Sequence, residues 1–350
     1  MMNVLGYAAL SPTADLTLYT FDRREPRADD VVVEILYCGV CHSDLHMAHN
    51  DWGWSFYPLV PGHEIIGRVL SVGSAVTRFK AGDNVGIGCM VDSCQHCKPC
   101  EQGLEQYCEN GHTLTYGSYD RHDQMPTYGG YSEKIVASEK FVLKIPQGLD
   151  LAGAAPLLCA GITTYSPLRH WKVTKGSKVA VIGLGGLGHM ALKLAKAMGA
   201  EVTLFTRSPG KEADARRLGA DAIVLSTDEE QMASAKGHYE LIIDTVPDVH
   251  DVNPYLNTLS LDGTLVLVGY VGGLEPILST VPLILGRKSV AGSVIGGIAE
   301  TQEMLDFCGE HNITSDIEMI NIQDINGAYE RMVKSDVKYR FVIDIASLKA

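Results

Sequence analysis

Short runs of β-branched and aliphatic residues, separated by Gly and Asp, characterise the first part of the chain. VVVEILY at 31–37 and IIGRVLSV at 65–72 have this character, and FKAGDNVGIG at 79–88 is similar. Apolar runs of this length between turn residues predict β-strands, and the helical period is weak here. The pattern predicts an irregular, mostly β front part.

From about Leu151 the pattern becomes an alternation of strand-like and helix-like segments. Amphipathic runs at 189–200 and 211–220 lie between apolar runs typical of buried strands, which occur at 178–183, 201–207, 222–225, 240–246 and 264–270. Such alternation is typical of a parallel, doubly wound sheet. We therefore expect an α/β protein whose second part is a doubly wound domain.

After 289–294 the alternation ends, and one helix-like run at 299–311 and one strand-like run at 339–345 remain. Because a six-stranded sheet is already complete, we expect this tail to return to the first domain. The expected organisation is a first domain at 1–155 with a lobe at 89–110, a second, doubly wound domain at 156–294, and a return to the first domain at 295–350. A chain of 350 residues is long enough for two such cores.

Charge and composition limit the classes of molecule that this protein is expected to bind. The net charge of −13 argues against nucleic acid, and no run of Lys and Arg suggests an anionic membrane. The N-terminus lacks a basic start followed by an apolar core, and no stretch reaches 18 uninterrupted apolar residues. We expect a cytoplasmic protein that acts on small molecules and whose nine cysteines are reduced thiols.

Four of these cysteines fall within CQHCKPCEQGLEQYC, at spacings of two, two and seven intervening residues: Cys94, Cys97, Cys100 and Cys108. The loop is polar and cannot form a core of its own. Four thiolates around Zn²⁺ would supply the missing folding free energy and leave no position for substrate, so this site is predicted to be structural. An iron–sulfur cluster is the rival, but the ferredoxin spacing and its following proline are absent.

A second group of potential metal ligands is spread along the chain. CGVCHSDLH and VPGHEIIG supply Cys41, His63 and Glu64, and Cys159 follows before the second domain. Two thiolates and one imidazole leave a zinc position open, which is the catalytic arrangement. Taken singly, each of these residues would more often be a buried cysteine or a hydrogen-bonded core histidine than a metal ligand.

The combination of GVCHSDLH, GHE, the four-cysteine lobe and the later GLGGLG resembles the zinc-containing medium-chain alcohol dehydrogenases. The run GVCHSDLHMAHNDWGWSFYPLVPGHEIIG is similar to the cinnamyl alcohol dehydrogenase branch, including its bacterial NADPH-dependent aldehyde reductases. The likeness covers nearly the whole chain. It implies a GroES-like, mostly β catalytic domain, a Rossmann cofactor domain, two zinc ions per chain and a homodimer.

The resemblance also assigns roles. Cys41, His63 and Cys159 fall on the family's catalytic zinc ligands, and Glu64 on the acid that can approach the metal. Ser43 and His46 fall on its proton relay, for which a hydroxyl and an imidazole are suitable chemistry. Asp44 matches the carboxylate that orients the zinc-bound imidazole. Asp51 matches a polar position near the relay.

The sequence SKVAVIGLGGLG carries Gly183-x-Gly185-x-x-Gly188 between a predicted strand and a predicted helix. In this context the motif, with Gly186 and Leu187 inside it, predicts a dinucleotide pyrophosphate site at a helix N-terminus. The second strand ends in TRSPGK, where an NAD-specific protein would place a carboxylate. Two hydroxyls and two cations there favour NADP(H): Thr206, Arg207, Ser208 and Lys211. Thr163 matches a family position near the nicotinamide.

Substrate is expected between the domains, with Trp52, Trp54 and Tyr57 as possible aromatic walls. Cys38, Cys89 and Cys308 are expected to be buried packing residues. The sequence thus predicts an NADP-dependent alcohol dehydrogenase working mainly as an aldehyde reductase, with aromatic aldehydes such as cinnamaldehyde among its substrates. An NAD-linked polyol or secondary-alcohol dehydrogenase, and an idle NADPH-binding protein of this fold, are the alternatives.

Overall fold

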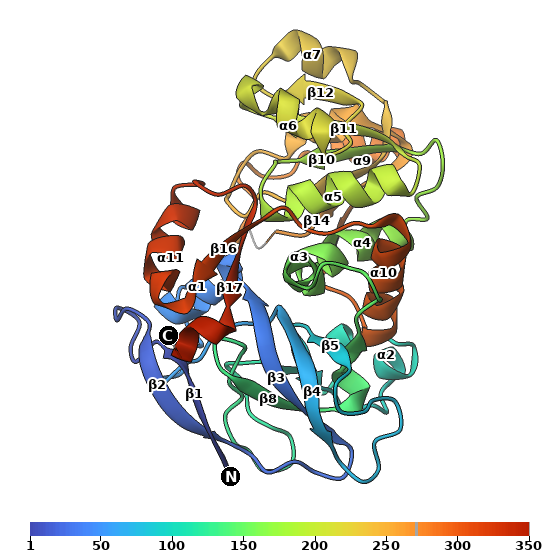
Figure 1. The fold of residues 1–350 in the computed structure, drawn as a ribbon. Coiled ribbons are helices and arrows are strands. Elements are labelled where there is room, and N and C mark those ends of the chain that lie inside the picture. Colours follow the sequence, from blue (N-terminus) through green and yellow to red (C-terminus); the bar gives the residue numbers. More distant parts are fainter. Residues whose placement is uncertain (270–271, 350) are drawn as a thin grey trace. The chain divides into compact units, whose positions relative to one another are not determined.

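The structure, a computed structural model, describes residues 1–269 and 272–349. The chain divides into two compact units, which are shown in Figure 1 and are described separately below. The first unit consists of Met1–Ile162 together with Gly296–Ala350, and the second consists of Thr163–Ile295.

The first unit is built on a seven-stranded sheet of order β16-β17-β3-β4-β5-β9, with β8 also paired to β3. All pairs are antiparallel except β16 with β17. The strands are β3 (Asp30–Gly39), β4 (Ile65–Val72), β5 (Asn84–Ile87), β8 (Lys134–Ser138), β9 (Leu143–Lys144), β16 (Ile317–Asn321) and β17 (Arg340–Asp344). Two smaller pairs are β1 (Met2–Ala8) with β2 (Thr17–Arg23), and β6 (Met90–Asp92) with β7 (Thr113–Leu114).

Strand β3 is central to this unit because it pairs with three other strands. Its residues 30–34 pair with β8, and its residues 37–39 pair with β17 from the C-terminal part of the chain. Its other edge pairs with β4 through two irregularities of register. Val31, Val33 and Cys38 are fully buried in the core, as expected for a strand with neighbours on both edges.

The helices of this unit are short. The α-helices are α1 (His42–His49), α2 (Lys98–Glu101), α3 (Leu151–Ala154), α10 (Ile298–His311) and α11 (Ile325–Val333). The 3₁₀ helices are η1 (Glu105–Tyr107), η2 (Glu139–Phe141), η3 (Ala155–Leu158), η5 (Ile322–Asp324) and η6 (Ile345–Lys349). The predicted helix at 299–311 is α10, whereas α1 and α11 were missed. In α1 the polar Asp44 is buried beside Leu45 and Met47, so no apolar stripe marks this helix in the sequence.

The second unit is a six-stranded parallel sheet of order β12-β11-β10-β13-β14-β15. Its strands are β10 (Lys178–Ile182), β11 (Glu201–Thr206), β12 (Ala222–Leu225), β13 (Tyr239–Asp244), β14 (Leu259–Leu267) and β15 (Ser289–Gly292). Its helices are α4 (Ala160–His170), which begins in the first unit, α5 (Gly186–Ala197), η4 (Pro209–Lys211), α6 (Glu212–Arg217), α7 (Glu229–Ser234), α8 (Asn253–Thr258) and α9 (Val281–Gly286).

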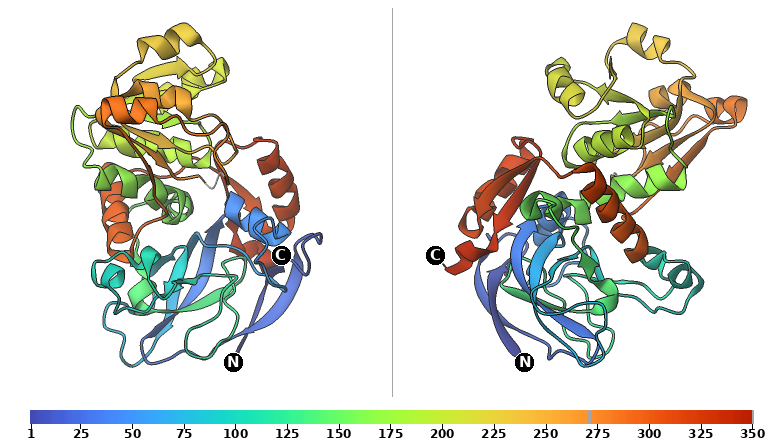
Figure 2. Two further views of the ribbon diagram at one scale, coloured as in Figure 1. Left: turned by 180° about the vertical axis from the view of Figure 1, so that it is seen from behind. Right: turned by 45° about the vertical axis from the view of Figure 1, so that its right-hand side comes forward.

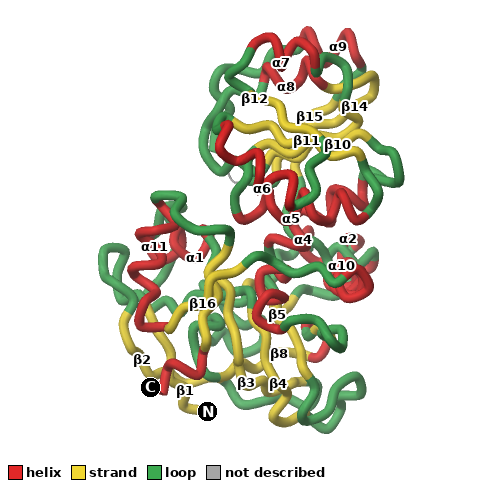
Figure 3. Tube along the Cα trace, turned by 45° about the horizontal axis from the view of Figure 1, so that its top comes forward, coloured by secondary structure: helices red, strands yellow, loops and turns green. Residues whose placement is uncertain are grey.

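Figure 3 shows the doubly wound arrangement of this unit, with α5 and α6 on one face of the sheet and α7, α8 and α9 on the other. This confirms the predicted fold class. The strand predicted at 264–270 begins earlier than expected, as β14, and its last residue lies outside the described residues. The order of strands reverses at β10, which has β11 on one side and β13 on the other. Ligands of such sheets bind at the carboxyl ends of the strands beside this reversal.

Within 1–269 and 272–349, no single helix has both the length and the apolar composition to cross a membrane. Only Leu151–Leu158 and Ala160–His170 taken together reach those limits, and they are bent by 58°.

Candidate metal and cofactor sites

The four cysteines of the lobe converge between β6 and β7. Their sulfur atoms all lie within 4.8 Å of one another, with 3.9 Å between those of Cys94 and Cys100 and 4.0 Å between those of Cys97 and Cys108. A tetrahedron with metal–sulfur bonds of about 2.3 Å requires sulfur separations of about 3.8 Å. The backbone N–H groups of Cys94 and Glu109 also point at sulfur, each at 3.4 Å. The lobe therefore fits a closed, four-sulfur metal site.

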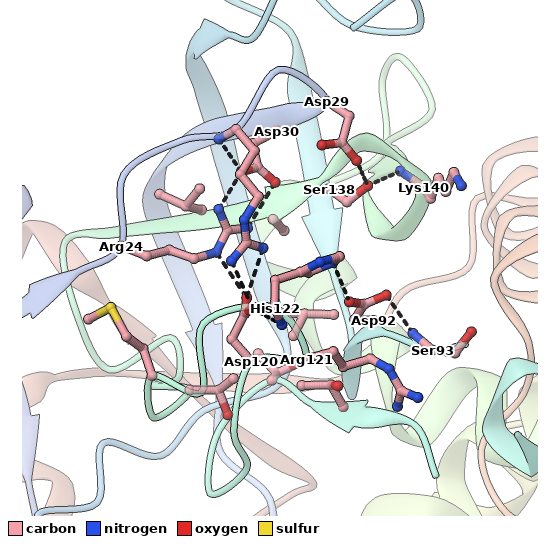
Figure 4. Close-up of a pocket in the computed structure, with 18 of the residues that line it drawn as sticks. Arg24, Asp29, Asp30, Asp92, Ser93, Asp120, Arg121, His122, Ser138 and Lys140 are labelled. Atoms are coloured by element: carbon pink, nitrogen blue, oxygen red, sulfur yellow. Dashed lines mark hydrogen bonds and ion pairs between the residues drawn. The ribbon is translucent and has the colours of Figure 1, made fainter. Parts of the chain in front are cut away.

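A polar cavity of about 470 Å³ lies beside the lobe in the first unit (Figure 4). Arg24 and Arg27 line it, and both pair with Asp120, at 3.1 and 2.8 Å. Arg24 also pairs with Asp30, and Arg27 also pairs with Asp123 at 2.7 Å. Both guanidinium groups therefore have carboxylate partners, and these ion pairs join the segment after β2 to the loop at 118–123.

A second set of ligand atoms comes from three separate segments of the first unit. Cys41 is the N-cap of α1, His63 and Glu64 directly precede β4, and Cys159 lies between η3 and α4. Their ligand atoms lie within 4.8 Å of one another. The two sulfurs are 4.0 Å apart, as the edge of a tetrahedral site requires.

The buried carboxylate of Asp44 aligns two of these ligands. Its Oδ2 accepts the backbone N–H of Cys41 at 2.9 Å, and its Oδ1 accepts the N–H of Gly62 at 3.0 Å. Oδ1 also lies 3.0 Å from Nδ1 of His63, which leaves Nε2 as the ring nitrogen that can face Cys41 and the cluster. Asp44 is fully buried, so these bonds replace its lost hydration.

Glu64 is the fourth group of the cluster and is also fully buried. One oxygen pairs with Arg340, and the other, Oε2, has no hydrogen-bond partner among the described residues. Burial raises the pKa of Glu64 to about 7 although Arg340 acts in the opposite direction. An unpaired buried carboxylate oxygen next to two sulfurs and an imidazole is a donor set that a cation would satisfy.

The two thiols of the cluster are inequivalent. The hydrogen bond between them lowers the pKa of Cys41 well below its usual value and raises the pKa of Cys159 well above its own. A hydrogen bond with Cys89 also raises the pKa of Cys159. Cys89 lies 3.7 Å from the carbonyl of Leu158 and is only half-buried, so its prediction as a buried packing residue was wrong. Cys38 and Cys308 are buried as expected.

The predicted relay residues lie on α1, just after Cys41. Ser43 and His46 are both half-buried and are three residues apart, which places them on one face of the helix. Nδ1 of His46 lies 2.7 Å from Oδ2 of Asp51. Trp52 lies against the His46 ring at 5.5 Å and stacks on Trp54 at 5.8 Å. The third residue predicted as an aromatic wall, Tyr57, donates its hydroxyl to the Ala48 carbonyl at 2.7 Å.

The glycine motif of the second unit forms the turn from β10 into α5, with Gly185 as the N-cap. Gly183 has a φ of +89°, and a Cβ on Gly188 would lie 2.2 Å from the Gly183 carbonyl oxygen, so both positions require glycine. A Cβ on Gly185 would meet nothing within 4 Å, so space remains in front of the helix. Gly186 and Leu187 begin α5. This is the geometry of a pyrophosphate site.

The TRSPGK turn follows at the end of β11. Thr206 is buried and accepts the N–H of Ser208 at 3.1 Å, whereas Arg207 and Ser208 are exposed. Nζ of Lys211 donates to the Leu184 carbonyl at 3.2 Å, so this cation lies against the glycine turn. Thr163, on α4, is buried.

Two models of known families match this chain. "Alcohol dehydrogenase GroES-like domain" matches residues 27–147, and "Zinc-binding dehydrogenase" matches residues 186–310. The chain belongs to the zinc-binding alcohol dehydrogenases. This confirms the predicted family, and with it an oxidoreductase enzyme.

Individual relatives cover the whole length of this alcohol dehydrogenase. It is 54% identical to a "Probable mannitol dehydrogenase" of Fragaria ananassa, over 98% of this chain and 95% of the relative. It is 51% identical to "Aldehyde reductase YahK" of Escherichia coli, over 99% of each. The solved structure of the cinnamyl alcohol dehydrogenase from Helicobacter pylori complexed with NADP(H) is 44% identical and covers 99% of each chain, with a TM-score of 0.91.

No pattern in the sequence of this alcohol dehydrogenase predicted the following three contacts. Arg340 lies in a strand-like run 276 residues from Glu64, and only the pairing of β17 with β3 brings it to the cluster. Asp244 ends β13, where its buried Oδ2 lies 2.9 Å from Nε2 of His250, and Thr245 donates to the Ile182 carbonyl at 2.7 Å. This second pair lies beside the glycine turn.

The Asp244–His250 pair predicts a pH dependence. The hydrogen bond that the His250 ring donates to the Asp244 carboxylate is the largest cause that raises the pKa of His250 above 6.5. A raised pKa in the folded state stabilises the protein below pH 6.5, and this contribution disappears as the pH rises through the folded-state pKa. His250→Gln should therefore lower the free energy of unfolding more at about pH 6 than under alkaline conditions. Urea denaturation at several pH values tests this, and an equal loss at every pH would contradict it.

Proposed function

We propose that this chain catalyses reversible hydride transfer between NADP(H) and primary alcohols or aldehydes, working mainly as an aldehyde reductase. The observation that carries the proposal is the buried cluster in which two sulfurs 4.0 Å apart share a site with an Asp44-oriented imidazole. The names of the relatives from Escherichia coli and Helicobacter pylori support this direction and this cofactor.

We propose that each chain holds two zinc ions. Cys94, Cys97, Cys100 and Cys108 would hold one of them in a closed, structural site, and Cys41, His63 and Cys159 would hold the other. Bound there, Zn²⁺ supplies Lewis acidity to a substrate oxygen at the open position. Glu64 contributes a carboxylate oxygen within 4.8 Å of these three ligand atoms. Arg340 compensates the charge of Glu64, so a metal would not be the only cation that neutralises this carboxylate.

The proton that completes the alcohol would leave the site along α1. Ser43 offers a hydroxyl close to Cys41 in the chain, and His46 is partly exposed to water. The Asp51 carboxylate, 2.7 Å from Nδ1 of His46, orients that ring so that Nε2 can exchange a proton. The stacked rings of Trp52 and Trp54 beside His46 favour aromatic aldehydes such as cinnamaldehyde.

NADP(H) would bind on the second unit at the carboxyl ends of β10 and β11. The N–H groups at the start of α5, from Gly185 to Gly188, suit the pyrophosphate. Thr206, Arg207, Ser208 and Lys211 suit the 2′-phosphate, and they include no carboxylate that would repel it. By resemblance, Thr163 would lie near the nicotinamide. The two units would thus be the catalytic and the cofactor-binding domain.

The name of the Fragaria relative raises the polyol alternative. An NAD-linked enzyme of that kind would need a carboxylate where this chain has Arg207, so the TRSPGK turn argues against it. The idle binding protein would require the loss of a ligand or relay residue, and all of them are present. None of the nine cysteines forms a disulfide within the described residues, which fits the cytoplasm, and we propose the cytoplasm as the location.

We also propose a homodimer formed through the edge of the second unit. Strand β15 pairs only with β14 among the strands that the structure describes. Beside it, α9 exposes Ile284 at 76% and Leu285 at 82%. An unpaired strand edge next to large exposed apolar side chains suits a symmetric interface between two copies.

Activity tests the central proposal. The wild-type protein, with its zinc content verified, should oxidise NADPH in the presence of cinnamaldehyde. Ser43→Ala should retain both zinc ions and lose activity by a factor of about 10² to 10⁴, because the relay hydroxyl is gone. Ser234→Ala, a surface serine of α7, is the matched control and should be fully active. If the wild-type protein reduced none of several aldehydes with either cofactor, the result would favour the alternative of an idle NADPH-binding protein.

Cofactor choice is tested at the TRSPGK turn. Arg207→Ala should raise the KM for NADPH by about 10- to 100-fold, because a charged hydrogen bond to phosphate contributes about 1.5–3 kcal/mol, and should leave the KM for NADH nearly unchanged. Steady-state kinetics with both cofactors measures this. Arg217→Ala on α6 is the control for removal of one cation from the same unit. Equal effects on both cofactors would contradict the assignment.

The dimer is tested by sedimentation. Leu285→Asp should yield a particle of about half the mass of the wild-type particle, because it buries a charge in the proposed interface. Leu261→Asp, which changes a leucine of β14 that is 70% exposed, should leave the mass unchanged. A wild-type monomer would refute the proposal.

A further inference from the structure

Two buried tyrosines connect the Asp44 carboxylate to the C-terminal part of the chain. The Tyr131 hydroxyl donates to Oδ2 of Asp44 at 3.3 Å, and the Tyr329 hydroxyl lies 3.5 Å from that of Tyr131. Tyr131 is fully buried and Tyr329 is 4% exposed. Figure 1 and the left view of Figure 2 show α11, which carries Tyr329, beside α1, which carries Asp44.

Backbone contacts hold the Tyr131 ring in place. Its N–H donates to the Pro61 carbonyl at 3.0 Å, and its own carbonyl accepts the N–H of Tyr7 at 2.8 Å. A Cβ on Gly62 would lie 2.7 Å from the ring carbon Cδ1 of Tyr131, so the ring lies directly on the turn that precedes His63. These contacts fix the ring, and the ring therefore holds its hydroxyl in position to donate to Asp44.

Core packing alone does not account for the hydroxyl groups. Phenylalanine would fill the same volume, whereas an unused buried hydroxyl costs free energy. Burial is the main reason that the pKa values of Tyr131 and Tyr329 are well above the ordinary value, so both groups remain protonated donors. Two O–H groups in series toward one carboxylate polarise each other and strengthen the final bond.

We propose that Tyr131, supported by Tyr329, is a positioning residue of the metal site: its hydroxyl fixes the Asp44 carboxylate, which in turn fixes the Cys41 backbone and the His63 ring. This inference rests on the proposed zinc site at Cys41, His63 and Cys159. Hydrogen-bond partners behind a ligating histidine typically change metal affinity by about 10- to 100-fold. In this chain, loss of the Tyr131 hydroxyl should weaken metal retention first, and activity only as a consequence.

The test measures the release of zinc from the whole protein to a coloured chelator. The four-cysteine lobe should release its zinc in a separate phase, and this phase serves as the internal reference for zinc release from the other site. Cys41→Ser identifies the phase that belongs to the other site. Tyr131→Phe should accelerate that phase by about 10- to 100-fold and leave the lobe phase unchanged. Tyr239→Phe, a buried tyrosine of the second unit, is the matched control and should change neither phase.

Tyr329→Phe is the second variant, and it keeps the proposal testable if Tyr131→Phe does not fold. It should accelerate the same phase by a smaller factor, about 2- to 10-fold, because it acts through Tyr131. For the same reason, the double variant should release zinc no faster than Tyr131→Phe alone. Release at the wild-type rate, or equal acceleration of both phases, would overturn the proposal. Wild-type protein that holds zinc only in the lobe would instead refute the proposed function itself.

Discussion

The candidate active site depends on the burial of one negative charge. The Asp44 carboxylate has lost its water and is satisfied by hydrogen bonds from Cys41, from the turn at 62–63, from Tyr131 and from Tyr116. An isolated buried carboxylate would be too costly to keep ionised, so all of these donors must be in place together. The same bonds set the positions of Cys41 and His63. The hydrogen bonds that satisfy this buried carboxylate therefore align two of the proposed metal ligands.

The neighbouring buried charge of Glu64 is managed differently. It has a single cationic partner, Arg340, and one oxygen without a partner among the described residues. Both oxygens of Asp44 are thus occupied by donors, whereas Glu64 keeps one carboxyl oxygen available to bind. The two acids lie in one cluster, and their different hydrogen bonding gives them different chemistry.

Sequence reasoning succeeded where function depends on residues that are close together in the chain. The lobe ligands lie within fifteen residues, and the glycine turn requires a strand, three glycines and a helix in immediate succession. Both were found, as was the parallel sheet, because buried strands and amphipathic helices have distinct periods. The helix α1 was missed because its buried face includes Asp44, which reads as a solvent-exposed position.

The remaining parts of the site could not be predicted because their partners are distant in sequence. Arg340, Tyr131 and Tyr329 are ordinary residues of a strand, a loop and a helix. Only the pairing of β17 with the end of β3 brings the C-terminal segment to Cys41. Cys89 shows the same limit, because no spacing rule connected it with Cys159. The resemblance to a known family supplied ligands and relay residues, but not the hydrogen bonds that hold them.

The return of the C-terminal segment to the first unit has a consequence for how the protein is made. During synthesis, the doubly wound unit at 163–295 is complete while β17 is still to be translated, and domains generally fold as units as they emerge. Until Arg340 leaves the ribosome, Glu64 has no cationic partner and β3 has a free edge at 37–39. The proposed metal cluster therefore cannot reach its final arrangement until β17 has been translated and has paired with β3.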